Sequence, residues 1–209
     1  MNIAFDAAAL LGPMSKNRGI GNYSYSQLKK MIELDQQNTY YFFNVFEEFY
    51  MEDHVTGGNI VDACFFCGKN YELAFDEEYK ELFGEIIRKF LRENKIDVFY
   101  MTSPFEGHIM RYCKEWFQGV KTVATVYDII PYVMKHKYLA DKAACRFYMQ
   151  RVDMLRWVDE YLVISQSVKD DMISYLQFPK ERIHVIYGAA DPDVYHPVEM
   201  SEQERKQLY

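Results

Sequence analysis

Two glycines near the start of the chain, Gly19 and Gly21, stand before a segment whose apolar residues have helical spacing. Asn22 follows them and is a candidate N-cap for that helix. Free backbone N–H groups and the positive end of the dipole at a helix N-terminus favour a phosphate, and glycine lets a ligand approach the backbone. The same glycines could serve only a tight turn. The pattern is neither a dinucleotide fingerprint, because its third glycine is missing, nor a P-loop.

A carboxylate, Asp128, follows directly on the apolar run 122–127 (TVATVY). At the end of a buried strand, a carboxylate could accept hydrogen bonds from the hydroxyls of a sugar or another polyol. It could equally cap the segment that follows it, as aspartate often does in turns. The sequence leaves both interpretations open.

Three polar residues, Ser103, Glu106 and His108, follow another apolar run at 96–101. A neutral histidine near a glutamate could carry a proton, because the pKa of histidine lies close to neutral pH. A histidine on a loop can also be no more than polar surface. We treat these three residues as candidate binding groups.

Ser165 comes directly after the apolar run 161–164 and offers a hydroxyl at the start of a helix. Two residues further on, Ser167 and Asp170 have the spacing of a capping box. This pattern predicts that Ser167 caps the helix, and Ser165 is kept as a candidate binding residue.

Alternating strands and helices must position these candidates. Runs rich in β-branched and aromatic residues predict strands at 2–6, 39–46, 60–66, 96–101, 122–127, 161–164 and 183–187. Apolar residues at helical spacing predict helices from 22 to the polar cluster at 35–38, and at 79–91, 144–155 and 167–176. This alternation favours an α/β fold with a doubly wound, mostly parallel sheet of about seven strands. Ligands bind such sheets beyond the carboxyl ends of the strands, where the candidates above are expected.

The composition is that of an ordinary globular protein. Of 209 residues, 49% are hydrophobic and 26% are charged, which excludes collagen-like and disordered classes. The net charge of -7 gives no general attraction to nucleic acid or to acidic membrane surfaces. No apolar run approaches the ~18 residues of a spanning helix, and the first residues lack the basic region of a signal peptide. We therefore expect a cytoplasmic protein.

The cysteines do not form a recognisable framework. Cys64 and Cys67 make one C-x-x-C pair, while Cys113 and Cys145 stand alone. A single pair is weak evidence for zinc, and on a strand its two members would point to opposite faces. We expect reduced cysteines that contribute to packing, and no metal site.

Four segments together resemble the N-terminal domain of the family 4 glycosyltransferases, which have a GT-B-type fold of two Rossmann-like domains. They are IAFDAAALLGP with RGIGNYSYSQLKKM at 3–13 and 18–31, TVATVYDIIPYV at 122–133, the run from YLVISQ to DVYHP at 161–197, and the tail at 202–209. The order and spacing of these segments carry the resemblance.

The resemblance implies a retaining transferase that moves a sugar from a nucleotide-sugar donor to a glycan or other hydroxyl acceptor, without a metal or cofactor. Gly19 and Gly21 match the loop that approaches the donor diphosphate, with Asn22 beside them. Asp128 matches the catalytic aspartate of a His-Asp or Tyr-Asp motif, and Tyr127 stands where many relatives have histidine. The acceptor side of the cleft would then include Ser103, Glu106, His108, Tyr127 and Ser165.

The resemblance also implies that residues 1–198 form the acceptor-side domain and that 199–209 begin the link to a C-terminal donor-binding domain. We then expect the 209 residues alone to be inactive, and the complete gene product to act on a nucleotide sugar and a glycan or lipid-linked acceptor. Peripheral membrane association is compatible with such an acceptor but has no support in the sequence. Two alternatives stay open: a stand-alone, non-catalytic sugar-binding or partner module, and a nucleotide-dependent oxidoreductase, which the incomplete glycine pattern disfavours.

Overall fold

The computed structural model describes residues 1–12, 15–44, 50–55, 57–64, 77–106 and 111–189, together with residues 195 and 202. Within these residues the chain forms a seven-stranded sheet in the order β3-β2-β1-β4-β5-β6-β7, and all neighbouring strands are parallel. The strands are β1 (Asn2–Asp6), β2 (Thr39–Asn44), β3 (Asn59–Cys64), β4 (Val98–Met101), β5 (Lys121–Val126), β6 (Glu160–Val163) and β7 (Ile183–Val185). The α/β class and the doubly wound sheet expected from the sequence are confirmed.

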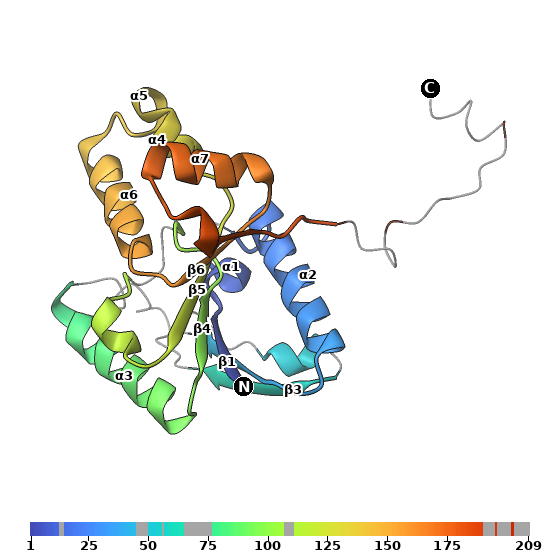
Figure 1. The fold of residues 1–209 in the computed structure, drawn as a ribbon. Coiled ribbons are helices and arrows are strands. Elements are labelled where there is room, and N and C mark those ends of the chain that lie inside the picture. The colour runs from blue at the N-terminus through green and yellow to red at the C-terminus, as the bar shows by residue number, and fades with distance from the viewer. Residues whose placement is uncertain are drawn as a thin grey trace.

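Helices cover both faces of the sheet, because a parallel sheet with apolar strands must be shielded on both sides. In Figure 1, α2 (Gly19–Leu34) lies on one side of the sheet, and α3 (Lys80–Glu93) and α6 (Lys142–Leu155) lie on the other. The remaining helices are α1 (Ala8–Leu11), α4 (Ile130–Val133), α5 (Lys135–Tyr138) and α7 (Gln166–Leu176). Single 3-10 turns are η1 (Met51–Asp53), η3 (Glu77–Tyr79), η4 (Lys114–Phe117) and η5 (Lys180–Arg182).

The core is organised around β1, which pairs with β2 on one side and with β4 on the other. Phe5 is fully buried on this strand, opposite Phe42 and Tyr100. Its ring stacks on Phe42 at a centroid distance of 5.6 Å and meets Tyr100 edge-on at 5.2 Å. Such pairs add packing energy beyond simple burial, so this aromatic cluster fixes the centre of the sheet.

The predicted helix starts are wrong by a few residues. Asn22 is not the N-cap of α2: its backbone N–H already donates to the Arg18 carbonyl, so the helix begins at Gly19 with Arg18 as N-cap. Ser167 is not the N-cap of α7, because the chain is still extended at Ser165 and the Ser165 Oγ accepts the Val168 N–H at 3.3 Å. In both cases the helix starts before the residue whose side chain suggested a cap.

The predicted strands agree with the structure to within about two residues where they can be compared. The run at 183–187 is too long, since β7 ends at Val185. The ends of two other runs, residues 45–46 and 65–66, lie outside the described residues, as does Cys67. Cys113 and Cys145 are free thiols.

Candidate functional site

The parallel arrangement brings the carboxyl ends of all seven strands to one edge. The strand order reverses between β1 and β4, which are adjacent although α2, β2, β3 and α3 separate them in the sequence. Open α/β sheets bind their ligands at this switch point. The residues that follow β1, β4, β5 and β6 are therefore the candidates for binding a ligand.

Asp6, the last residue of β1, is buried at the switch point. Its Oδ1 accepts the Thr102 N–H at 2.8 Å and the Thr102 hydroxyl at 2.6 Å, and its Oδ2 accepts the Tyr112 hydroxyl at 3.2 Å. Burial raises the pKa of this carboxyl, while the hydrogen bonds from Thr102 and Tyr112 oppose the rise. Asp6 thus holds the start of the loop after β4 against the end of β1.

Sequence reasoning alone passes over Asp6. The signal that could have found it is the one that singled out Asp128, an acid at the end of an apolar strand. What distinguishes the two acids is burial: Asp6 is 2% exposed, and Asp128 is exposed to solvent.

The loop after β4 contains two of the predicted binding residues, Ser103 and Glu106, and both are buried. The Glu106 carboxylate accepts a hydrogen bond from the Ser15 hydroxyl, and a Cβ on Gly12 would lie only 3.1 Å from the Glu106 Cγ. This contact ties the loop after β4 to the segment that precedes α2. His108 lies outside the described residues.

The N-terminus of α2 has open backbone donors. The first helical hydrogen bond of α2 is made by the Asn22 N–H to the Arg18 carbonyl at 3.0 Å, and the side chain of the N-cap residue Arg18 makes no capping hydrogen bond with the described residues. The N–H groups of Gly19, Ile20 and Gly21 precede that bond, so the helix itself leaves them unpaired. They carry the positive end of the dipole of a 16-residue helix.

The two glycines at this N-terminus differ in why they are needed. A Cβ on Gly21 would lie 2.6 Å from the Ser15 carbonyl oxygen and 2.8 Å from that of Lys16, so tight packing explains Gly21. A Cβ on Gly19 would meet nothing within 4 Å, and Gly19 is exposed. Packing therefore does not account for Gly19.

Tyr127 joins three segments beneath this edge. Its hydroxyl donates to the Thr102 carbonyl at 3.1 Å and lies 2.5 Å from the Ser24 Oγ of α2. Its ring meets that of Tyr23 edge-on at 5.6 Å, and Tyr23 donates to the Ile186 carbonyl after β7 at 2.8 Å. Burial raises the pKa of Tyr127, so its hydroxyl keeps its proton at neutral pH and acts as a structural donor.

Asp128 caps the segment that follows it, which is one of the two roles left open by the sequence. Its Oδ1 accepts the Ile130 N–H at 2.9 Å, which supports the first turn of α4. Its Oδ2 makes no hydrogen bond with the described residues and is available to a hydroxyl. The Asp128 carboxylate also affects Tyr148 of α6. Burial is the main reason why the pKa of the Tyr148 hydroxyl is raised, and the negative charge of Asp128 is the second.

The Tyr148 hydroxyl is buried and has no hydrogen-bond partner in the described part of the chain. The Tyr132 backbone approaches it without forming a hydrogen bond of ordinary geometry. The Tyr148 ring stacks on Phe105 at 4.7 Å, which places it against the loop after β4. Ser165, half-buried at the end of β6, is occupied as the N-cap of α7.

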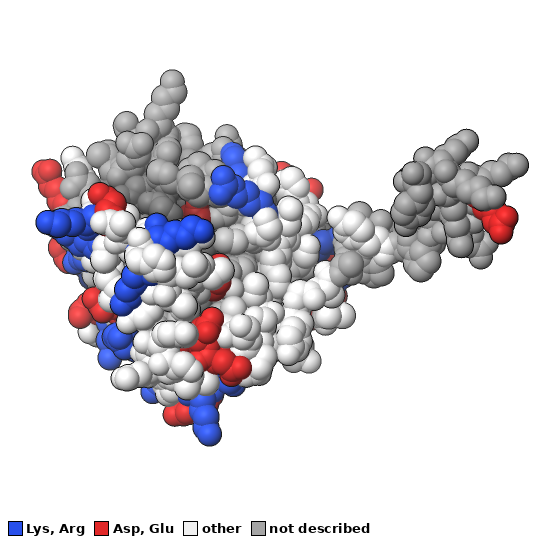
Figure 2. All heavy atoms as spheres, turned by 90° about the horizontal axis from the view of Figure 1, so that it is seen from above, with Lys and Arg blue, Asp and Glu red and all other residues white. Residues whose placement is uncertain are grey.

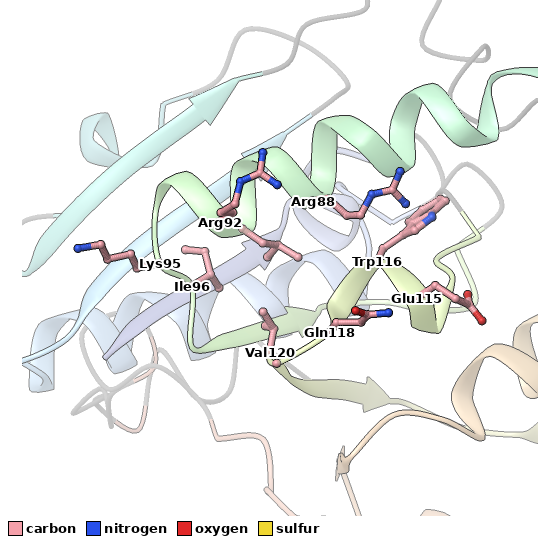
Figure 3. A pocket seen from close by; sticks show the side chains of 10 residues that line it. Arg88, Arg92, Lys95, Ile96, Glu115, Trp116, Gln118 and Val120 are labelled. Carbon is pink, nitrogen blue, oxygen red and sulfur yellow. The ribbon is translucent and has the colours of Figure 1, made fainter.

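A separate groove lies at the opposite edge of the sheet. A cavity of about 400 Å³ is lined by residues that precede β4 and β5, and Arg88 and Arg92 of α3 and Trp116 of η4 are among them (Figure 3). The groove contains none of the residues singled out by the sequence, so we do not assign the candidate site to it.

Two further properties of the described residues bear on the site. They contain no group of three or more His, Cys, Asp or Glu side chains arranged to hold a metal ion. None of their helices combines the length and the apolar composition needed to cross a membrane.

The sequence from residue 18 to residue 194 matches the family model described as Glycosyltransferase Family 4. The chain belongs to Glycosyltransferase Family 4. The match includes the N-terminus of α2, Asp128 and Ser165, and it confirms the family resemblance inferred from the motifs. β1 and Asp6 precede the matched residues.

Curated proteins similar to this family 4 chain include the serotype-specific mannosyltransferase WbdA of Escherichia coli. One WbdA is 33% identical over 104 residues, which cover 46% of this chain and 12% of WbdA, and another is 32% identical over 100 residues, which cover 44% and 12%. This chain therefore corresponds to a small part of those relatives.

Solved structures share the fold. HepE from Anabaena in complex with UDP has a TM-score of 0.52 at 13% identity over 99% of this chain and 49% of that one. A glycosyltransferase from Rickettsia africae has a TM-score of 0.51 at 14% identity, over 99% and 48%. UDP-GlcNAc 2-epimerase from Neisseria meningitidis, bound to UDP-GlcNAc, has a TM-score of 0.52 at 9% identity, over 88% and 46%. The family 4 chain spans about half the length of these structures.

Proposed function

We propose that this chain forms the acceptor-side domain of a retaining glycosyltransferase, which moves a sugar from a nucleotide-sugar donor to a hydroxyl of a glycan or lipid-linked acceptor. Family membership supports sugar transfer as the class of reaction. The observation that carries the proposal is the open N-terminus of α2, which lies at the edge formed by the carboxyl ends of the strands and includes an exposed glycine that packing does not require.

In this proposal the N–H groups of Gly19, Ile20 and Gly21 face the diphosphate of the donor. When the bond between the sugar C1 and the phosphate oxygen breaks, negative charge grows on the departing nucleoside diphosphate. Backbone donors that are already aligned stabilise that charge without reorganising. The missing Cβ of Gly19 leaves room for the phosphate oxygens to reach the backbone.

Asp128 takes the acceptor side of the reaction. Its Oδ1 is held by the Ile130 N–H, which fixes the carboxylate, while its Oδ2 accepts a hydrogen bond from a reacting sugar hydroxyl. The hydroxyl oxygen then forms the new bond to C1 on the face that the phosphate leaves, and the hydroxyl proton passes to the Asp128 Oδ2. Tyr127 positions Asp128 through its own bonds to Thr102 and Ser24.

The remaining acceptor contacts are proposed for the residues around this centre. Ser103 and Glu106 lie in the loop after β4, His108 follows them in the sequence, and Ser165 lies two residues after the end of β6. Glu106 and Ser165 already form hydrogen bonds within the protein. We therefore propose that they fix the conformation of the loops that contact the acceptor.

The test compares Asp128→Asn with Asp141→Asn in the complete gene product. Both aspartates are exposed, and both accept backbone N–H groups at the start of a helix: Ile130 for Asp128, and Ala143 and Ala144 for Asp141. An asparagine oxygen can keep these bonds, so each variant should fold. We expect Asp128→Asn to lower sugar transfer by about a hundredfold, and Asp141→Asn to leave it unchanged.

Transfer from a panel of nucleotide sugars is measured as nucleotide release and acceptor glycosylation. Equal activity of the two variants would remove Asp128 from the reaction. If the complete gene product transfers no sugar but binds glycans in calorimetry, the non-catalytic sugar-binding module replaces the proposal.

A further inference from the structure

Large apolar side chains are exposed together on the segment 130–138, which consists of α4, Met134 and α5. Ile130 and Tyr138 are each 47% exposed, Val133 is 38% exposed and Met134 is 37% exposed. Neither α4 nor α5 contains a buried residue. Single exposed apolar residues are normal on soluble proteins, but a contiguous group marks a surface that binds something.

The same segment is basic. Lys135, His136 and Lys137 follow one another on α5 and are exposed, and Lys142 begins α6. Within the described residues none of these lysines forms a salt bridge: the Lys135 Nζ lies 3.7 Å from the centre of the Tyr132 ring, and the Lys137 Nζ lies 5.4 Å from that of Tyr138. The two ammonium groups thus lie over aromatic rings, and both lysines remain exposed to solvent.

Acidic neighbours do not cancel this charge. Asp141 caps α6, where its carboxylate accepts the N–H groups of Ala143 and Ala144 and interacts with the positive end of that helix. Asp128 lies before the segment and is held by the Ile130 N–H. The segment 130–138 itself contains no acidic residue, although the chain as a whole carries a net charge of -7.

The segment lies at one end of the molecule, where Tyr132 packs against the core and the side chains named above remain exposed. In Figure 1, α4 and α5 lie at the top, at the edge where β5 ends. Figure 2 looks onto the molecule from above and shows Lys and Arg side chains interspersed with uncharged and acidic ones. The exposed apolar side chains of the segment are therefore accessible from this end of the molecule.

We infer that the segment 130–138 docks on an anionic lipid surface. Apolar side chains flanked by lysines match the membrane interface, where apolar groups enter the headgroup boundary and lysines pair with lipid phosphates. The positive charges of the lysines favour an anionic lipid surface over a neutral one. The inference is independent of the proposed sugar transfer; if both hold, a lipid-linked acceptor would present its hydroxyl two residues from this segment, at Asp128.

The experiment measures partition of the protein onto vesicles of phosphatidylcholine alone and onto vesicles that also contain phosphatidylglycerol, by sedimentation at low salt. We expect binding only to the anionic vesicles, and loss of binding when the salt concentration is raised. Lys135→Gln with Lys137→Gln should weaken binding about twenty-five-fold, because each lysine near an anionic surface contributes about fivefold. Val133→Ser with Met134→Ser should also abolish binding to the anionic vesicles.

The matched controls change the same residue types elsewhere. Lys180→Gln with Arg182→Gln removes two charges from η5, which precedes β7 and so lies at the opposite edge of the sheet. Leu34→Ser with Leu82→Ser removes two apolar side chains that are 82% and 54% exposed on α2 and α3. Both controls should bind vesicles like the wild type.

Several outcomes would overturn the inference. Wild-type protein that stays in solution with anionic vesicles, or controls that lose binding as the segment variants do, would end it. Dimerisation that the Val133 and Met134 substitutions abolish, without vesicle binding, would make the segment a contact between copies. Vesicle binding by the 209 residues but not by the complete gene product would show that another part of the protein covers the segment.

Discussion

The Oγ of Ser24, in the second turn of α2, lies 2.5 Å from the hydroxyl of Tyr127, the residue that follows β5. The Tyr127 hydroxyl donates to the Thr102 carbonyl, so it must accept its second hydrogen bond from Ser24. This bond ties the helix that carries the open N–H groups to the strand end that carries Asp128. The Tyr127 hydroxyl therefore links the two halves of the candidate site, which are the N-terminus of α2 and the end of β5 with Asp128.

Replacing Tyr127 with phenylalanine should destabilise the fold. The variant leaves the Thr102 carbonyl and the buried Ser24 hydroxyl without their partner, and we expect the free energy of unfolding in urea to fall by about 1–3 kcal/mol. Tyr25→Phe is the matched control, because the Tyr25 hydroxyl makes a solvent-exposed bond to the His54 carbonyl at 3.2 Å. An equal loss of the free energy of unfolding in the two variants would contradict a structural role for the Tyr127 hydroxyl.

The glycines of α2 should separate stability from activity. Gly21→Ala places a methyl group against the Ser15 and Lys16 carbonyls, so we expect a loss of about 1–3 kcal/mol in the free energy of unfolding. Gly19→Ala has room for the methyl group and should be neutral or more stable by up to about 1 kcal/mol. In the complete gene product Gly19→Ala should nevertheless slow sugar transfer; full activity would exclude a donor contact at this residue.

Tyr148→Phe should stabilise the protein, because it removes a buried hydroxyl that has no hydrogen bond. We expect an increase of about 1 kcal/mol in the free energy of unfolding. Tyr161→Phe is the opposite case: the Tyr161 hydroxyl donates to the Leu155 and Val158 carbonyls at 2.6 Å and 3.0 Å, so its loss should destabilise the fold. A destabilised Tyr148→Phe variant would mean that this hydroxyl has a partner in the folded protein.

Asp6 should make stability depend on pH. Burial raises its pKa in the folded protein above the ordinary 3.8, so folding favours the protonated carboxyl. Its stabilising contribution is complete below pH 3.8 and is lost as the pH rises through the folded-state pKa. Asp6→Asn cannot ionise, so its free energy of unfolding minus that of the wild type should increase with pH across this range. Urea unfolding at a series of pH values measures the difference, and a difference that stays constant or falls would refute the prediction.

The architecture was predictable because its elements are long or strongly patterned. The apolar stripe of α3 and the short β-branched runs each identify an element without tertiary information. Helices α1, α4 and α5 were missed because four residues are too few to show a helical period. The cap of α7 was misplaced because two serines stand two residues apart, and only the extended backbone of Ser165 decides between them.

The candidate site was predictable as a set of positions, but the task of each residue was not. Gly19 and Gly21 look alike in sequence, and the carbonyls of Ser15 and Lys16 separate them. Asp6 and Asp128 both end apolar strands, and burial of one and exposure of the other gives them different chemistry. Such distinctions depend on contacts between segments that are distant in sequence, which no local pattern contains.

The placement of β1 affects how the protein can fold during synthesis. Its five residues are synthesised before both of their partners in the sheet, β2, which starts at Thr39, and β4, which starts at Val98. The middle of the sheet cannot form until nearly half of the 209 residues have been synthesised, because β4 starts at Val98. Such high contact order slows folding and leaves apolar strands uncovered on the nascent polypeptide, where chaperones would find their binding sites.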